Sequence, residues 1–414
     1  MTDSRQRTLL IISQVYAPDP AAVGQHMTDV AEEMTRRGWR VIVYTSARGY
    51  DDSSQRYPSR ERRNGVDVRR LPLSSFGKRS IAIRLLAQSL FMLQATVLGL
   101  LTRGLGLVLV STSPPFAGMG GSLVSFFRRA PLVWWVMDLN PDQMIAAGKV
   151  GARSIPARVF EWINRCTMRQ ASEIVVLDRF MKDRVLAKLS VPAKVRVLPP
   201  WPHQDRPGVP PLEPNVFRIT HGLEDAFVVM YSGNHAIQHP LDTLLAAAAE
   251  LESDPRLRFV FIGGGAGKDA VDARLAAGAS NIVSLPYEPL EKVSDSLAAA
   301  DVHVVSMGND MVGIVHPCKI YGAMAVGRPI LFFGPERSHV EELLRLGSCG
   351  VSLRHGDVSG AVTAIRELRA LSNVSLVELG RNAAKVVAQA FSRAASLNAF
   401  CTFLENAERG GVGH

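Results

Sequence analysis

Two residues of one short segment, His316 and Lys319, have side chains suited to holding a phosphate. They stand in residues 313–329, GIVHPCKIYGAMAVGRP, where a loop leads into a helix. Lys319 brings a full positive charge, His316 can donate a hydrogen bond, and Pro317 suits a first helical turn. A solvated lysine and a loop histidine without a ligand would have the same sequence. This segment alone therefore leaves open both a phosphate site and ordinary exposed side chains.

A further candidate, Asp138, stands in the segment WWVMDLNPD, directly after an apolar run typical of a strand. Catalytic side chains of α/β proteins gather at the carboxyl ends of strands, and Asp142 follows one turn later. Asp138 could instead be the N-cap of a helix, a position that aspartate favours. The sequence therefore offers Asp138 either for substrate contacts or for helix capping.

The pattern around the first segment indicates a strand, a loop, a helix and a second strand. Residues 301–305 (DVHVV) predict the first strand, and residues 319–326 predict a helix that ends before Gly327 and Pro329. Ligands of open α/β sheets bind beyond the carboxyl ends of the strands, where helix N-termini offer free N–H groups. A phosphate site is therefore expected at this unit.

The same alternation runs through the whole chain of 414 residues, which is too long for one core. It is interrupted by a Pro-rich stretch at 199–214, which is typical of a linker. We therefore predict two doubly wound α/β domains, 1–205 and 206–390, that face an interdomain cleft. Residues 391–414 are expected to form a helix that returns to the N-terminal domain.

Composition restricts the class of protein. Hydrophobic residues make up 47% and charged residues 21%, which indicates a globular chain. The four cysteines are scattered, which argues against a zinc site or a disulfide framework and fits a reducing cytoplasm. No signal peptide is expected, because the first apolar run, 9–12, is too short. The net charge of +9 predicts attraction to anions such as a nucleotide, a nucleic acid or a membrane surface.

Residues 80–102 form an apolar stretch that approaches the length of a membrane span. Arg84 is its only charge, yet glutamines and hydroxyl residues interrupt it and a strand pattern follows directly. We expect a buried or interface-lying helix and not a span. Arg79, Arg84, Arg128 and Arg129 would favour docking on an anionic bilayer, and a core helix with solvated arginines is the alternative.

In their order along the chain, these segments resemble the retaining glycosyltransferases of family 4, which have two Rossmann-like domains in the arrangement called GT-B. The resemblance covers nearly the whole chain, and its segments are weak singly but specific as an ordered set. They are the opening strand–loop–helix 11–46, SPP at 113–115, DLNPD at 138–142, VLPPW at 197–201, YSGN at 231–234, FIGGG at 261–265 and AMAVGRP at 323–329. The most similar branch builds bacterial surface polysaccharides such as O-antigen on lipid carriers, and often has PSK where this chain has Pro317, Cys318 and Lys319.

The chain departs from the family at four positions. The two glutamates that members usually carry would fall at Ile314 and Gly322. The arginine and lysine that usually hold the donor diphosphate appear as Asn234 and His239. A buried diphosphate without a compensating cation is costly, so Lys319 becomes the expected cation, with uncharged donors beside it.

The resemblance implies metal-independent transfer of a hexosyl or N-acetylhexosaminyl unit, with retention and without a cofactor, from a nucleotide-sugar that is expected to be a UDP-sugar. The expected acceptor is a lipid-diphosphate-linked glycan precursor at the cytoplasmic face of the cell membrane. The expected catalytic residues, of which Asp138 would orient sugar hydroxyls, are Asp138, His316 and Lys319. The expected donor-binding residues are Gly233, Asn234, His235, His239, Gly263, Gly264, Leu285, Pro286, Tyr287, Pro317, Cys318 and Tyr321. Those expected on the acceptor side are Gly24, Gln25, His26 and Asp142.

Two other functions remain open from the sequence. A nucleotide-sugar epimerase of the same architecture would turn over the donor without an acceptor. A non-catalytic partner subunit would explain the missing glutamates, although the retained HPCK segment and Asp138 argue against it. A nucleic-acid binder is disfavoured, because the basic residues are not interleaved with aromatic ones and no recognition motif is present.

Overall fold

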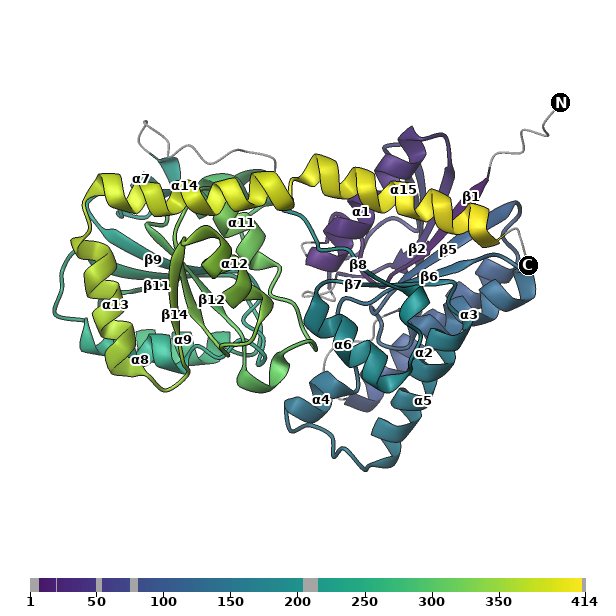
Figure 1. Ribbon diagram of the computed structural model, residues 1–414, viewed down its shortest axis with the longest axis horizontal. Coiled ribbons are helices and arrows are strands. Elements are labelled where there is room, and N and C mark those ends of the chain that lie inside the picture. The colour runs from purple at the N-terminus through teal and green to yellow at the C-terminus, as the bar shows by residue number, and fades with distance from the viewer. Residues whose placement is uncertain (1–6, 20, 50–53, 75–80, 204–214, 412–414) are drawn as a thin grey trace. The chain divides into compact units, whose positions relative to one another are not determined.

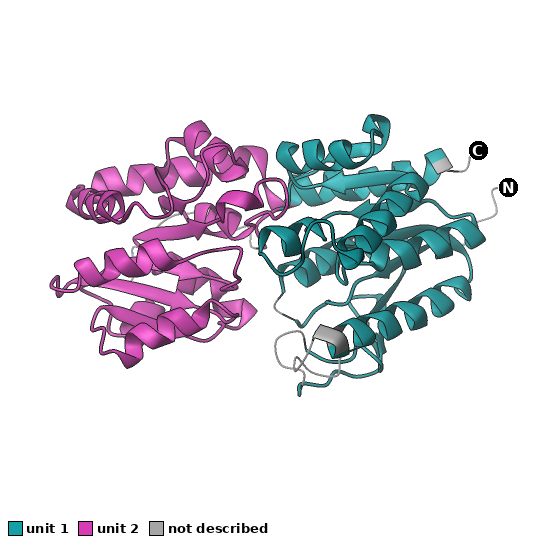
Figure 2. Ribbon diagram, turned by 90° about the horizontal axis from the view of Figure 1, so that it is seen from below, with its two compact units in different colours: residues 1–200, 394–414 teal, residues 201–393 magenta. Residues whose placement is uncertain are grey.

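A computed structural model describes residues 7–19, 21–49, 54–74, 81–203 and 215–411. Linker residues 204–214, Arg79 and the side chain of Arg84 lie outside the described part. The chain divides into two compact units, Met1–Pro200 with Ala394–His414, and Trp201–Arg393, which Figure 2 colours separately. The chain therefore leaves the first unit at residue 200 and rejoins it at residue 394.

The first unit is built on an eight-stranded sheet with the order β3-β4-β2-β1-β5-β6-β7-β8. Its strands are β1 (Thr8–Ile12), β2 (Arg40–Ser46), β3 (Arg60–Arg63), β4 (Val66–Leu71), β5 (Leu105–Ser111), β6 (Leu132–Trp135), β7 (Glu173–Val176) and β8 (Val195–Val197). Strands β1 and β6 are buried throughout, as expected for parallel strands covered on both faces. The neighbours pair in parallel except β3 and β4, which pair antiparallel.

The hairpin of β3 and β4 was not predicted, because β3 reads RERR and gives no apolar alternation. The readable signal was the turn between the strands, Asn64 and Gly65, whose φ angles of 47° and 85° are those of a tight hairpin turn. The otherwise parallel sheet of the first unit therefore ends in a short, arginine-rich antiparallel edge.

Helices cover both faces of this sheet. They are α1 (Ala22–Arg36), α2 (Ile81–Leu100), α3 (Ala117–Arg128), α4 (Asp142–Ala146), α5 (Ile155–Gln170), α6 (Arg179–Lys188), the 3-10 turn η1 (Pro192–Lys194) and α15 (Arg393–Gly411). Helices α2, α3, α5 and α6 gather on one face, and α1 and α15 on the other (Figure 1). The Phe400 ring of α15 packs 4.1 Å from the Trp135 ring of β6, measured between centroids. This contact anchors the last helix on the first sheet.

The second unit holds a six-stranded parallel sheet with the order β11-β10-β9-β12-β13-β14. Its elements are α7 (Val216–Thr220), β9 (Phe227–Ser232), α8 (Asp242–Glu250), β10 (Leu257–Ile262), α9 (Lys268–Ala276), β11 (Ile282–Leu285), η2 (Leu290–Lys292), α10 (Val293–Ala298), β12 (Val302–Ser306), η3 (Asn309–Met311), α11 (Lys319–Ala325), β13 (Ile330–Phe333), α12 (His339–Gly347), β14 (Gly350–Leu353), α13 (Val358–Ala370) and α14 (Asn373–Ala390). The strand order reverses between β9 and β12. The carboxyl ends of the strands at this switch point are where an open α/β sheet binds ligands.

Two expectations about helices differ from the structure. The sequence pattern predicts one helix at 290–300, where the structure has a 3-10 turn followed by α10. It predicts two helices between the last strand and the C-terminus, where the structure has three. The extra break falls at Ser372, whose hydroxyl accepts from the N–H of Ser375 and caps α14. A serine cap interrupts a helical pattern less visibly than proline or glycine does. In the described part of the chain, none of the helices has the length and apolar content needed to cross a membrane.

Candidate functional site

The loops that follow β9, β10 and β11 are joined by backbone hydrogen bonds at the carboxyl edge of the second sheet. Gly233 N–H donates to Ile262 O at 2.9 Å, and Gly263 N–H donates to Leu285 O at 3.0 Å. His235 N–H donates to Gly264 O at 2.7 Å. Many of the predicted donor-binding residues therefore lie along one edge of one unit.

Gly263 is required by the close approach of two of these loops. Its φ is 124°, and a Cβ atom there would overlap the Gly233 carbonyl oxygen. That Cβ, or one on Gly264, would also come within 3.2 to 3.3 Å of the Tyr287 ring. The Tyr287 hydroxyl donates to Gly264 O at 3.3 Å. The FIGGG segment thus brings bare backbone beneath an aromatic ring.

Lys319, the first residue of α11, extends toward the end of β9. Its Nζ hydrogen-bonds the Tyr231 hydroxyl, lies 3.7 Å from that ring's centroid, and donates to Asn234 O at 3.3 Å. Among the described residues no carboxylate lies within ion-pair distance of Nζ. Burial lowers the pKa of Lys319 to about 7. A cation without an anionic partner at the ligand-binding edge of a sheet is suited to binding an anion.

Pro317 and Cys318 form the approach to this lysine. Cys318 occupies the N-cap position of α11, and its N–H donates to His316 O at 2.9 Å. Pro317 lies one residue before the cap, so it precedes the first turn and is not part of it. Helix α11 has seven residues, so its own dipole is that of a short helix.

His235 is buried beside this lysine. Its ring packs edge-on against Tyr231 with 4.7 Å between centroids. Neither ring nitrogen has a hydrogen-bond partner among the described residues. Burial, with the nearby charges of Lys268 and Lys319, lowers the pKa of His235 to about 3. A neutral imidazole with two unused nitrogens can hydrogen-bond a ligand in either direction.

His239 is held in one tautomer. Its Nδ1 lies 2.7 Å from Ser306 O, and a carbonyl oxygen can only accept, so Nδ1 carries the proton. Burial lowers the pKa of His239 to about 3, which keeps the imidazole neutral. Nε2 is then an acceptor. His239 therefore fits a sugar hydroxyl better than the phosphate donor role expected from the sequence.

Sequence reasoning missed Lys268. Its Nζ donates to Phe261 O at 3.0 Å and to Leu285 O at 2.9 Å, so it links the ends of β10 and β11. Burial lowers the pKa of Lys268, and the charge of Asp272 opposes that shift. The available signal was a lysine at the helix start after the glycine-rich loop GGGAG.

The contacts of Lys268 limit which backbone groups could hydrogen-bond a nucleotide base. Leu285 O already accepts from the N–H of Gly263 and from Lys268 Nζ, which uses both of its lone pairs. From the family resemblance, backbone groups of Leu285, Pro286 and Tyr287 are expected to read the base, and of these residues Pro286 and Tyr287 keep backbone groups outside this pair of bonds. Recognition of a base by backbone groups there stays a prediction.

The predicted catalytic His316 lies in a buried aromatic cluster of the second unit. Its Nε2 is 3.0 Å from the Tyr321 hydroxyl, which is also 2.9 Å from Nε2 of His339. The Tyr321 ring packs 5.1 Å from that of Phe391. A tyrosine hydroxyl has one proton, so it donates to one imidazole and accepts from the other. The role of His316 near a sugar stays a prediction, with its ring orientation set by Tyr321.

The two positions where the family usually has glutamates are packed against apolar groups. Ile314 is buried. A Cβ on Gly322 would lie 3.3 Å from the Leu297 side chain. A side chain at position 322 would crowd this leucine at its Cβ, and neither position supplies a carboxylate.

In the first unit, Asp138 lies just beyond the carboxyl end of β6. Its N–H donates to Thr112 Oγ1 at 3.1 Å, and the Met137 N–H donates to the same oxygen at 3.1 Å. Helix α4 begins at Asp142, and its N-cap position is Pro141. The capping alternative for Asp138 is therefore wrong for this helix, and its role toward a substrate stays a prediction.

The acceptor-side candidate with a carboxylate, Asp142, belongs to an ion-pair network. Lys188 Nζ lies 2.6 Å from Asp142 and 2.6 Å from Glu161. Arg184 is 3.8 Å from Asp142. An acceptor bound through Asp142 would compete with these cations.

Gly24, Gln25 and His26 lie in the first two turns of α1. A Cβ on Gly24 would lie 3.1 Å from Tyr16 N, so this glycine allows the preceding loop to pack on the helix. His26 is buried, with its ring 6.2 Å from that of Trp135. Gly24 is thus explained by the packing of the loop against α1. Contacts of these residues with an acceptor stay a prediction.

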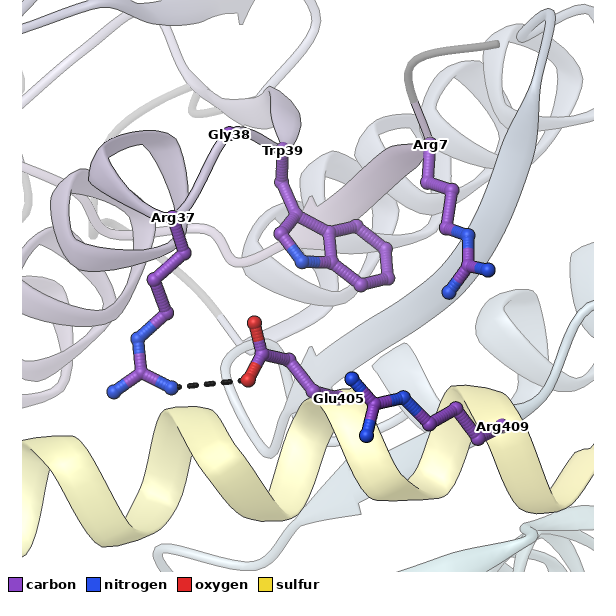
Figure 3. Close-up of a pocket in the computed structure, with 6 residues that line it drawn as sticks. All are labelled: Arg7, Arg37, Gly38, Trp39, Glu405 and Arg409. Carbon is purple, nitrogen blue, oxygen red and sulfur yellow. Dashed lines mark hydrogen bonds and ion pairs between the residues drawn. The ribbon is translucent and has the colours of Figure 1, made fainter. Parts of the chain in front are cut away.

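A cavity of about 170 Å³ lies at the amino edge of the first sheet, which is the edge opposite the carboxyl ends of its strands. Figure 3 shows the residues that line it, which are Arg7, Arg37, Gly38, Trp39, Glu405 and Arg409. Arg37 lies 3.1 Å from Glu405 and also donates to Asn398 O. These groups join α15 to the residues that precede β1 and β2. We therefore assign the cavity to the packing of α15 on the first sheet and not to ligand binding.

Comparison with known families agrees with the two-unit division. Residues 21–201 match the family described as Glycosyl transferase 4-like domain, and residues 226–370 match Glycosyl transferases group 1. WbjE of Pseudomonas aeruginosa, which is named a glycosyltransferase, is 25% identical over 71% of this chain and 72% of its own length. WcaI of Escherichia coli K12, which is named a glycosyl transferase of colanic acid biosynthesis, is 24% identical over 77% of this chain and 81% of its own.

Solved structures agree at the level of the fold. Sucrose-phosphate synthase of Thermosynechococcus elongatus superposes with a TM-score of 0.76 at 16% identity, covering 97% of this chain and 99% of its own. HepE of Anabaena in complex with UDP-glucose superposes with a TM-score of 0.70 at 15% identity, covering 96% and 99%. The two family matches together span most of the chain. The chain belongs to the GT-B glycosyltransferases that join a Glycosyl transferase 4-like domain to a group 1 domain.

Proposed function

We propose that this protein is a retaining glycosyltransferase that moves a hexosyl or N-acetylhexosaminyl unit from a UDP-sugar to a lipid-linked acceptor in cell-surface glycan biosynthesis. The observation that carries the proposal is the position of Lys319. It is a cation without a carboxylate partner among the described residues, placed beside Asn234 at the ligand-binding edge of the second sheet.

The donor would lie along the loops after β9, β10 and β11. Lys319 would contact the diphosphate, with backbone N–H groups of the same loops and the ring of His235 beside it. The negative charge on the departing diphosphate grows as the bond to the sugar breaks, and a prepositioned cation at that point stabilises the transition state. His239 Nε2, an acceptor, would bind a sugar hydroxyl. No residue of this set requires a metal, so we propose metal-independent transfer.

The base would pack against Tyr287 and the bare backbone of Gly263 and Gly264. That HepE binds UDP-glucose in a similar fold supports uracil as the base. Asp138 would orient hydroxyls of the acceptor or the donor sugar, and His316 would lie near the sugar. The role of Asp138 rests on the family resemblance and on its position beyond the end of β6, and that of His316 rests on the resemblance alone.

The acceptor assignment rests on the relatives. WcaI is named for colanic acid biosynthesis, and the sequence resembles transferases that act on lipid carriers. We therefore propose a lipid-diphosphate-linked glycan as acceptor, met at the cytoplasmic face of the cell membrane. The basic chain, with a net charge of +9, suits such an anionic surface.

The experiment that tests the donor site is the shift in melting temperature with UDP, GDP and ADP, each with and without a chelator. Ligand at about a hundred times its dissociation constant should stabilise the protein by about 2.7 kcal/mol. We expect stabilisation that is selective for UDP, insensitive to the chelator and lost in Lys319→Ala. The Lys149→Ala variant, in the other unit, is the control.

Turnover separates the enzyme from its alternatives. With a UDP-sugar that stabilises the protein, slow donor hydrolysis abolished by Lys319→Ala would indicate a transferase. Interconversion of the sugar without an acceptor would indicate an epimerase. The absence of any shift with all three nucleotides would overturn the donor site and favour the partner-subunit function, which the apolar packing at Ile314 and Gly322 would then explain.

A further inference from the structure

Three rings of the second unit meet at one hydroxyl group. His316 precedes α11, Tyr321 is the third residue of α11, and His339 is the first residue of α12. The Tyr321 hydroxyl lies 3.0 Å from Nε2 of His316 and 2.9 Å from Nε2 of His339. We call these three side chains the His–Tyr–His bridge. His339 belongs to none of the sites described above, so its place in the bridge requires its own explanation.

Helices α11, α12 and α14 hold the bridge in place. Helix α14 packs against both α11 and α12 (Figure 1). Phe391, at the C-cap position of α14, places its ring 5.1 Å from that of Tyr321 and 6.2 Å from that of His339. Ser338 caps α12 by accepting from the Glu341 N–H at 3.3 Å, which fixes the helix start beside His339. The rings therefore meet in one arrangement, with an aromatic side chain packed against two of them.

The bridge runs from a buried imidazole to a partly exposed one. Tyr321 and His316 are buried, whereas His339 is half-buried. The rings of His316 and Tyr321 are within 13° of parallel, and the two imidazole rings lie 4.8 Å apart between centroids. A buried hydroxyl without a hydrogen bond is costly, so Tyr321 has a strong reason to keep both of its contacts.

The shared hydroxyl couples the tautomers of the two histidines when both rings are neutral. Tyr321 has one proton, so it donates to one imidazole and accepts from the other. If His339 donates from Nε2–H, then Tyr321 donates to Nε2 of His316, and the proton of His316 is on Nδ1. If His339 accepts, then Tyr321 accepts from Nε2–H of His316, and Nδ1 of His316 carries a lone pair. The tautomer of His339 therefore decides whether Nδ1 of His316 is a donor or an acceptor.

We propose that Tyr321 and His339 are positioning residues of the transferase, which set the tautomer of His316. The proposal deepens the proposed function and rests on it at one point, the placement of His316 near the donor sugar. Through Nδ1 the ring offers either a proton or a lone pair to the group that it meets, which in the proposed function is a sugar hydroxyl.

The tautomer of His316 matters for a hydroxyl that other contacts hold in one orientation. Such a hydroxyl binds only one form of the ring, because the other form would oppose two protons or two lone pairs. Tyr321, which the sequence predicts as a donor-binding residue, then acts on the donor through His316.

Two charged substitutions of His339 fix the bridge in opposite directions. In His339→Glu the carboxylate can only accept, so Tyr321 donates to it and His316 must carry its proton on Nε2. In His339→Lys the ammonium can only donate, so Tyr321 donates to His316, whose proton is then on Nδ1. Position 339 is half-buried at a helix start, so it has room for either side chain, and urea unfolding verifies that both variants fold.

Nuclear magnetic resonance of protein labelled with ¹⁵N in its histidine rings reads each tautomer, since protonated and unprotonated ring nitrogens resonate far apart. The chain has ten histidines, and the signals lost in His316→Gln identify those of His316. At about pH 8 an unperturbed imidazole is neutral. We expect opposite tautomers for His316 and His339 in the native protein. His316 should carry its proton on Nε2 in the glutamate variant and on Nδ1 in the lysine variant.

Tyr321→Phe separates an effect through the hydroxyl from an effect of charge through space. A charge at position 339 would still act on His316 through space after the hydroxyl is removed. We expect the difference between the two charged His339 variants to disappear in the Tyr321→Phe background. His221→Glu and His221→Lys place the same charges on another half-buried histidine of the second unit, which packs on Phe217, and should leave His316 unchanged.

Donor turnover measures the consequence at the sugar. With a UDP-sugar that stabilises the protein, kcat for donor hydrolysis should differ at least about tenfold between the two charged His339 variants. UDP itself has no sugar, so stabilisation by UDP should be the same in both variants and in the native protein. A native protein that UDP does not stabilise would count against the proposed donor site, and the tautomers would still report on the bridge.

Four outcomes would overturn the proposal. The first is the same tautomer for His316 and His339 in the native protein, which needs no variant to detect. The second is a His316 tautomer that is identical in the two charged His339 variants. The third is a difference between those variants that persists in the Tyr321→Phe background, which would assign it to charge alone. The fourth is a tautomer that switches as expected while kcat stays equal, because the bridge would then have no role in turnover.

Discussion

The ammonium group of Lys319 lies 3.7 Å from the centre of the Tyr231 ring, and burial lowers the pKa of this lysine to about 7. An anionic diphosphate binds the protonated form. Above pH 7 the free protein must therefore take up a proton to bind the donor, and affinity should fall by about tenfold per pH unit until the pKa of the bound state is reached. Titration calorimetry with a UDP-sugar from pH 6 to pH 9 measures this slope.

Lys319→Arg is the control for that slope, because a guanidinium stays charged over this range. Its affinity should be nearly independent of pH. His235 and His239 have pKa values near 3 and remain neutral throughout, so they do not contribute in the free protein. A slope that persists in the arginine variant would assign the titration to another group.

Gly263→Ala should damage the donor site. A side chain there would strain a backbone φ of 124° and overlap the Gly233 carbonyl oxygen. We expect a loss of stability of about 2 to 3 kcal/mol in urea unfolding and at least about tenfold weaker UDP binding. Gly278→Ala, at φ 91° with open space around it, carries backbone strain without the overlap and should leave UDP binding intact.

Asp301→Asn should destabilise the second unit. Asp301 Oδ2 lies 2.5 Å from Arg218 and accepts from the N–H of Val228 at 2.8 Å. Loss of the charge leaves a half-buried guanidinium uncompensated, which should cost about 2 to 3 kcal/mol. Glu336→Gln breaks an exposed pair with Arg354 at 3.2 Å and should cost less than about 1 kcal/mol. Equal losses in the two variants, measured by urea unfolding, would contradict this account.

Phe400→Ala should loosen α15 from the first sheet. Phe400 is buried against Trp135, so truncation leaves a cavity and should cost about 3 to 5 kcal/mol. Phe127→Ala removes an equally large but exposed ring and should leave stability within about 0.5 kcal/mol. Thermal unfolding followed by near-ultraviolet circular dichroism would detect the loss of Trp135 packing. An unchanged transition in Phe400→Ala would show that other contacts hold the helix.

The sequence predicted two doubly wound α/β units, because parallel strands buried on both faces give continuous apolar runs such as those of β1 and β6. The GT-B arrangement was predicted from the family resemblance. It failed for β3, whose charged residues carry no alternation, and for Ser372, whose cap interrupts a helix without proline or glycine. Long elements with a strong apolar period can be predicted from the sequence. The formation of a short edge strand depends instead on the strands beside it.

The candidate site was only partly readable. Gly233 and Gly263 follow strands directly, and Lys319 begins the helix after β12, so their position at the sheet edge could be predicted. The use of Lys268 as a link between Phe261 and Leu285, and the pairing of His316 with Tyr321, depend on side-chain directions that spacing alone does not define.

The chain enters its first unit, leaves it at residue 200 and returns with α15. During synthesis the ribosome therefore releases the first sheet long before the helix that covers Trp135 exists. Until the last residues emerge, that tryptophan and its neighbours lack their partner Phe400. A nascent chain stalled anywhere in the second unit would hold a first unit without its last helix, a species that chaperones and proteases can distinguish from the finished enzyme.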